Sequence, residues 1–179
     1  LSRRQRQMCI RDRSKESTPF HFWSVPTREY PQAGVITALY KDDDGHIVSG
    51  VEGEGVFKIT SEGNITDHLF SGKTVSSIYK DYSGNLWFGG YYSGLYMQDA
   101  KGNVRFMLPE IKLKDIKKIT GDDKGNLYLS LFGSGFIRYH LPTQTVTEYQ
   151  SSSGGLRNNW IYTLLLDSRE RLWIGHCNG

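Results

Sequence analysis

Short apolar segments alternate with polar turns along the chain from residue 35 onward. In residues 75–107, for example, four apolar segments of four to six residues are separated by Asp, Ser, Gly and Asn. Segments of this length that are rich in β-branched and aromatic residues and bounded by turn residues predict β-strands. The chain holds 20 Gly against 5 Pro, a balance that favours short strands joined by tight turns. The expected fold class is therefore all-β.

The chain contains four tandem repeats whose central parts align without gaps. A turn position recurs at intervals of 39, 41 and 45 residues, and a second glycine follows ten residues after the first three of these positions. A period of about 40 residues with four strands in each unit is typical of the blades of a β-propeller. The turn positions are Gly45, Gly84, Gly125 and Glu170, and the second glycines are Gly55, Gly94 and Gly135.

The repeats predict a partial β-propeller of four-stranded blades, truncated at both ends. A single blade cannot bury both faces of its sheet, so neighbouring blades must stack on one another. The side chains expected to fill the space between sheets recur in register as Ile47–Val48, Leu86–Trp87, Leu127–Tyr128 and Leu172–Trp173. We assign residues 14–34 to the end of a preceding blade or a lead-in, and 35–179 to the propeller arc, with blades at about 35–74, 75–115, 116–160 and an incomplete 161–179.

The first connection within each repeat begins with an aspartate. A carboxylate in this place can accept hydrogen bonds from backbone N–H groups two residues on, and a glycine in the last place can adopt the left-handed conformation that closes a hairpin. We therefore expect positive φ at Gly45, Gly84 and Gly125. Glu170 replaces the glycine in the fourth repeat, where it either bears a strain of about 1 kcal/mol or belongs to a different turn. The aspartates are Asp42, Asp81, Asp122 and Asp167.

The repeat pattern of an apolar strand, Asp-x-x-Gly, x-Leu-Trp-x-Gly and a further Gly-apolar strand resembles the two-component regulator propeller. This is the sensor repeat of bacterial hybrid histidine kinases. The best matches are residues 81–89 and 167–175. Repeats one and three depart from the pattern, because Val48 and Tyr128 replace the Trp and Ser130 replaces the glycine that follows it.

The resemblance implies a fragment of the extracytoplasmic, ligand-sensing propeller of a two-component signalling protein. It also implies a periplasmic location within an inner-membrane protein, an oligosaccharide ligand and a homodimer in the full-length protein. The histidine kinase and the membrane segment would lie outside this chain, which would need no cofactor and would not itself be an enzyme. Two alternatives stay open: a propeller enzyme such as a lyase, and a propeller that serves only as a protein-interaction scaffold.

One face of the propeller is the expected ligand-binding surface. In a propeller, the connections between the second and third strands and those between blades emerge on the same side. Aromatic rings there can stack on the C–H faces of sugars, and Glu or His can orient hydroxyl groups. For any single ring, the alternative is that it only seals the gap between blades. The candidates are Glu52, Tyr91, Tyr92, Phe132, Trp160 and His176, the last expected in a connecting loop.

Patterns for metal binding or catalysis are weak. Asp42-Asp43-Asp44-Gly45 faintly resembles a calcium loop, but Tyr40 stands where an oxygen ligand is needed and the distal Glu is missing. Glu52 and Glu54 are interpreted as solvated loop acids rather than as a catalytic pair. The five His are scattered, and one of the two Cys lies in the first 13 residues. We therefore predict neither a metal site nor catalytic residues.

The first 13 residues differ from the rest of the chain. They carry five Arg and one Asp, and residues 3–12, RRQRQMCIRD, resemble the translation of a sequencing adapter at all ten positions. We interpret residues 1–13 as an artefact rather than a nucleic-acid-binding arm or the start of a signal peptide, and expect residues 3–12 not to pack on the propeller. Without residues 1–13 the formal net charge falls from +3 to −1. A near-neutral domain offers no electrostatic footprint for nucleic acid or an anionic membrane.

Overall fold

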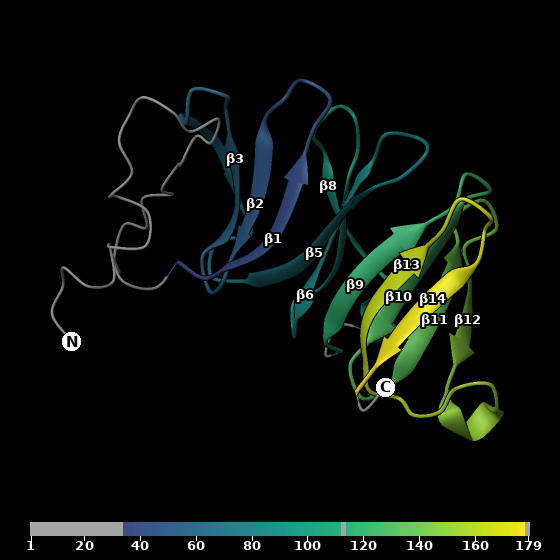
Figure 1. The fold of residues 1–179 in the computed structure, drawn as a ribbon. Helices are drawn as coiled ribbons and strands as arrows, with labels where there is room; N and C mark the ends of the chain where they lie inside the picture. The colour runs from purple at the N-terminus through teal and green to yellow at the C-terminus, as the bar shows by residue number, and fades with distance from the viewer. Residues whose placement is uncertain (1–33, 112–113, 178–179) are drawn as a thin grey trace, which may run out of the picture.

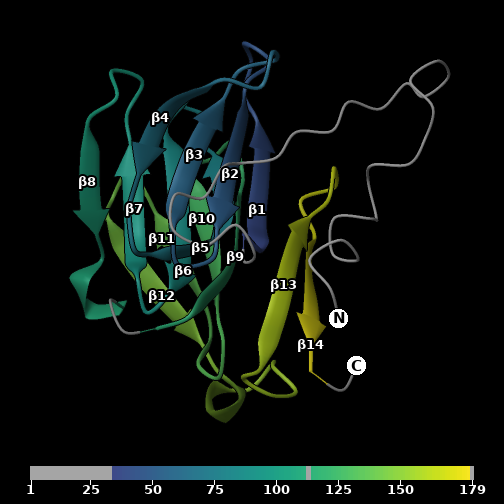
Figure 2. The ribbon, with the colours of Figure 1, turned by 90° about the vertical axis from the view of Figure 1, so that its left-hand side faces the viewer.

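The structure is a computed structural model that describes residues 34–111 and 114–177. The interpretations of residues 1–13 and 14–33 fall outside this part of the chain. The described residues form antiparallel sheets that stand one after another in an arc (Figure 1). Each four-stranded sheet has its strands in chain order, as Figure 2 shows for the first sheet.

The arc comprises three four-stranded blades and two strands of a fourth within the described residues, so the prediction of a partial β-propeller is confirmed. Two short 3-10 helices, η1 (Pro109–Ile111) and η2 (Ser151–Ser153), lie in the connections between blades. The first blade holds β1 (Ile36–Lys41), β2 (Ile47–Val51), β3 (Gly55–Ile59) and β4 (Ile65–Leu69), and the second β5 (Thr74–Lys80), β6 (Leu86–Tyr91), β7 (Gly94–Gln98) and β8 (Val104–Met107). The third holds β9 (Ile116–Gly121), β10 (Asn126–Leu131), β11 (Gly135–His140) and β12 (Thr145–Tyr149), and the fourth β13 (Ile161–Leu166) and β14 (Leu172–His176).

Apolar side chains between the sheets hold neighbouring blades together. Trp87 is 1% exposed and packs with Leu95, Ile119 and Leu129 between the second and third blades. Smaller clusters join the first blade to the second and the third to the fourth. Trp173 occupies the same motif position in β14 but is 55% exposed, because no further blade lies against that side among the described residues. The expected packing role of Trp87 is therefore observed directly.

The first strands β1, β5, β9 and β13 contact one another from blade to blade. Each contains a β-bulge near its start, where the pairing with the second strand of the blade skips one position. In the first blade, the Thr37 hydroxyl donates to the Val75 carbonyl at 2.5 Å, and in the second, the Ser76 hydroxyl donates to the Ile116 carbonyl. These bonds tie adjacent blades together. The bulged residues are Thr37, Ser76, Lys117 and Tyr162.

Candidate functional site

The aspartate of the repeat motif and its tryptophan form one hydrogen-bonded unit. One carboxylate oxygen of Asp81 accepts the backbone N–H groups of Ser83 and Asn85, both at 2.9 Å. The other oxygen accepts the indole N–H of Trp87 at 2.7 Å. The same carboxylate therefore closes the turn and satisfies the polar atom of a buried ring. The sequence analysis expected the first of these roles and not the second.

The fourth repeat keeps this unit although Glu170 replaces the glycine. Asp167 accepts from the N–H of Arg169 at 2.9 Å and from the indole of Trp173 at 2.8 Å. Glu170 has φ 59° and donates its N–H to the Asp167 carbonyl at 3.0 Å, as Gly84 does to Asp81. Of the two alternatives for Glu170, the structure has the same turn with a left-handed non-glycine residue. Positive φ is confirmed at the three glycines, with 85° at Gly45, Gly84 and Gly125.

The same hydrogen bonds make the fourth turn sensitive to acid. The indole N–H of Trp173, with the N–H groups of Arg171 and Arg169, lowers the pKa of Asp167 from 3.8 to about 2. Because the pKa is lower in the folded chain, the stabilisation is complete above pH 4 and is lost as the pH falls toward 2. We expect the Asp167 carboxyl carbon to titrate near pH 2 by NMR, and Trp173→Phe to move this titration upward. An unchanged midpoint in that variant would contradict the role given to the indole.

The connections between blades meet those between second and third strands on one side of the arc, as expected. Gly53 N–H donates to the Thr74 hydroxyl at 2.9 Å, and Phe132 N–H donates to the Asp115 carbonyl at 2.9 Å. Gly135 N–H donates to the Asn159 carbonyl at 3.1 Å. We call this side, formed by residues 52–54, 70–73, 91–93, 114–115, 132–134 and 150–160, the loop face.

Four aromatic rings and one lysine gather on the loop face between the second and fourth blades. Phe132 lies edge-on to both Trp160 and Tyr162, with ring centroids 4.8 and 5.0 Å apart. Lys117 Nζ lies 3.8 Å from the centroid of Tyr91 and 4.8 Å from that of Phe132. It also donates to the Tyr91 hydroxyl at 2.5 Å. We call these five residues the aromatic cluster.

The structure brings three of the six candidates into the aromatic cluster, namely Tyr91, Phe132 and Trp160. Tyr92 adjoins it, since its N–H donates to the Asp115 carboxylate at 3.2 Å, and its ring is 70% exposed. Glu52 lies in the equivalent connection of the first blade, separated from Phe132 by the whole second blade. Its N–H donates to the Val35 carbonyl, and the structure does not bring its side chain to the cluster.

The placement of His176 in a connecting loop was wrong. It is the last residue of β14 and pairs with Ile161 of β13. Because the strand continues to this point, its ring is partly enclosed and its Nδ1 atom is buried. His176 therefore extends the sheet rather than standing free on the rim.

The sequence analysis missed Lys117 and Tyr162, which complete the aromatic cluster. Both occupy the bulged position of a first strand, where the first two blades have Thr37 and Ser76. The sequence repeats show the change at this position: the first two have a small hydroxyl residue, the third has a lysine and the fourth has a tyrosine. This signal was not used, since the strands were read as unbroken.

Two segments of the chain match the family model for the two component regulator propeller, residues 69–92 and 155–178. They contain the two Asp–Trp pairs described above. These are two-component regulator propeller repeats. The hydrogen bond from the indole to the turn carboxylate gives the physical reason why the repeat carries Asp and Trp six positions apart.

The proteins that this chain resembles include a histidine kinase and the extracellular domain of a two-component system. A histidine kinase of Formosa agariphila is 28% identical over 168 residues, which cover 81% of this chain and 12% of the kinase. The extracellular domain of a candidate hybrid two-component system of B. thetaiotaomicron has a TM-score of 0.72 at 24% identity, over 87% of this chain and 22% of that one. The chain thus spans less than a quarter of the length of either protein.

A virginiamycin B lyase of Staphylococcus aureus has the same fold. Its TM-score is 0.65 at 18% identity, over 80% of this chain and 50% of the lyase. At this identity the similarity concerns the fold alone. None of the helices in the described residues is long and apolar enough to cross a membrane.

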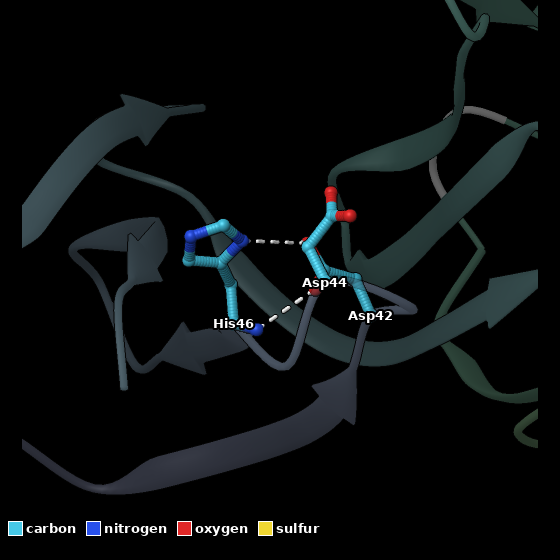
Figure 3. Close-up of side chains that lie close together, drawn as sticks. All are labelled: Asp42, Asp44 and His46. Carbon is cyan, nitrogen blue, oxygen red and sulfur yellow. Dashed lines mark hydrogen bonds and ion pairs between the residues drawn. The ribbon is translucent and has the colours of Figure 1, made fainter. Parts of the chain in front are cut away.

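The first repeat of the chain has Val48 where the second and fourth have Trp, and its turn is completed differently. Asp42 accepts the His46 N–H at 2.8 Å and forms an ion pair with Lys58 at 2.9 Å. Asp42, Asp44 and His46 place one ligand atom each within 4.8 Å of one another, which is close enough for a metal ion (Figure 3). The carboxylate of Asp42 is already engaged by Lys58 and by the His46 ring at 3.4 Å. In this turn, Lys58 and His46 contact the Asp42 carboxylate, which in the second and fourth repeats accepts a hydrogen bond from a Trp indole. These contacts explain why Asp42, Asp44 and His46 lie close together without a metal ion.

Proposed function

We propose that this chain is part of the ligand-sensing propeller of a two-component signalling protein and that its ligand is an oligosaccharide. In this proposal the propeller lies in the periplasm, acts by binding alone and belongs to a homodimer whose kinase is elsewhere in the full-length protein. The repeats, the kinase relative and the extracellular structural relative support the signalling context.

The aromatic cluster is the observation that carries the ligand-binding part of the proposal. Within it, Trp160 is 51% and Tyr162 50% exposed, and the adjoining Tyr92 is 70% exposed, although large rings are usually mostly buried. Rings fixed edge-on to one another present flat apolar surfaces at set angles. Such surfaces suit the C–H faces of sugar rings, while nearby polar groups can direct hydroxyl groups.

Replacing Tyr91 and Tyr92 together with Ala is expected to weaken oligosaccharide binding about tenfold or more, because two ring contacts are lost. The measurement is calorimetry on the full-length receptor with its best-binding oligosaccharide. The fold should persist, since both side chains are exposed.

Tyr82→Ala provides the matched control. Tyr82 is 55% exposed, between Tyr91 at 36% and Tyr92 at 70%, but lies in the turn between β5 and β6, at the opposite end of β6. We expect this variant to bind as the unmodified protein does. If the double variant keeps full affinity, or if Tyr82→Ala loses as much, the loop face is not the binding surface.

A further inference from the structure

The bulged position of the first strands changes its chemistry along the arc. In the first two blades it holds Thr37 and Ser76, whose hydroxyl groups are used up in bonds to the next first strand. In the third blade it holds Lys117, which extends to the loop face instead. The position therefore links neighbouring blades in the first two repeats and places a positive charge on the loop face in the third.

Lys117 is held between two equivalent side chains of adjacent blades. Tyr91 and Phe132 occupy the same repeat position at the end of the second strand, Tyr91 in the second blade and Phe132 in the third. The Lys117 ammonium lies against both rings. A cation is attracted to the face of an aromatic ring, so the rings restrict its position. One of its three N–H donors is used by the Tyr91 hydroxyl. The ammonium is thus fixed in place while retaining donor capacity.

The charge of Lys117 is not neutralised within the described residues. No carboxylate there lies within ion-pair distance of its Nζ atom. The nearby Asp115 uses one carboxylate oxygen to accept the N–H of Tyr92. Lys114, on the same connection, donates to the Ser134 hydroxyl at 3.0 Å and brings a second positive charge to the loop face. The surface around the rings therefore carries more positive than negative charge, in a domain whose formal net charge outside residues 1–13 is −1.

We propose that the aromatic cluster binds an anionic sugar, with Lys117 receiving its carboxylate or sulfate group and Trp160 and Tyr162 contacting the sugar ring. A charged group on a sugar supplies the partner that Lys117 lacks, and the adjacent exposed rings supply the apolar surface that a sugar ring requires. This inference rests on the proposed function and adds the charge class of the ligand to it.

The test uses the full-length protein on an array of neutral, uronic-acid-containing and sulfated oligosaccharides, followed by calorimetry with the tightest-binding member. We expect the bound members to be acidic, and the uronic acid and sulfate arms identify which group is recognised. Lys117→Gln should weaken binding about tenfold or more, Lys117→Arg should restore most of it, and raising the salt concentration should weaken binding of the unmodified protein. Melting temperatures check that each variant is folded.

Lys118→Gln is the matched control, because Lys118 is the next residue on β9 and is exposed. It should bind as tightly as the unmodified protein. If only neutral members bind, or if Lys117→Gln and Lys118→Gln behave alike, the charge assignment is overturned while oligosaccharide sensing stands. If no member of the array binds, the proposed function is itself overturned, and this inference with it.

Discussion

Replacing Trp87 with Ala is expected to lower the free energy of unfolding by about 3–5 kcal/mol, the usual range for deleting a buried aromatic side chain. Trp87 is 1% exposed, lies in the core between the second and third blades and faces Tyr139 edge-on at 6.3 Å. Its removal would leave a cavity between two sheets and would deprive Asp81 of the indole donor. Urea denaturation followed by circular dichroism measures the change.

Two further variants separate packing from hydrogen bonding. Trp87→Phe keeps most of the ring but removes the N–H, so we expect a smaller loss, of about 1–3 kcal/mol. Trp173→Ala removes the same motif residue from an exposed position in this chain, where the indole is bonded to Asp167. Its effect should be about 1 kcal/mol. Equal losses at Trp87 and Trp173 would contradict the assignment of the first to an interblade core.

The fold could be predicted because the signals that encode it are local. The turn of the second repeat is built from hydrogen bonds between Asp81 and groups two, four and six residues further on. A sequence pattern with these spacings contains the whole unit, and its recurrence about every 40 residues then determines the blades. Even Glu170, which breaks the pattern, adopts the turn of its relatives, since the other hydrogen bonds remain.

The candidate site could be predicted only in part, because it combines residues of three blades. Phe132 and Trp160 follow from the rule that two kinds of connection share one side. Lys117 does not, since a lysine on a strand looks the same in sequence whether it faces solvent or another ring. Only the bulge, which adds one residue to the strand and alters its alternation, directs Lys117 to the loop face.

His176 was misplaced because the expected end of the second strand was too early. It aligns with Gly90 of the second repeat, which lies within β6 and pairs with Gly94 of β7. The second strand therefore runs further in the structure than the sequence analysis assumed, and His176 is its last residue in the fourth repeat.

Replacing Gly135 with Ala is expected to lower the free energy of unfolding by about 3 kcal/mol or more. A Cβ atom there would lie 2.0 Å from the carbonyl oxygen of Tyr149, and the residue has φ +79°. The left-handed conformation alone costs an alanine about 1 kcal/mol, and the contact with backbone cannot be relieved by turning a side chain. The ends of β11 and β12 would have to separate, which weakens the third blade. Thermal or urea denaturation measures the loss.

Gly102→Ala isolates the conformational part of this effect. Gly102 has φ +87°, but a Cβ atom there would meet nothing within 4 Å. We expect it to cost only about 1 kcal/mol, so that the difference between the two variants reports the close approach of β12 to β11. That approach joins Gly135 to Tyr149, which lies 14 residues further along the chain. The ten-residue spacing of the glycines in the sequence therefore predicts that position 135 holds glycine but not why it must. Equal losses in the two variants would mean that backbone conformation alone requires glycine at position 135.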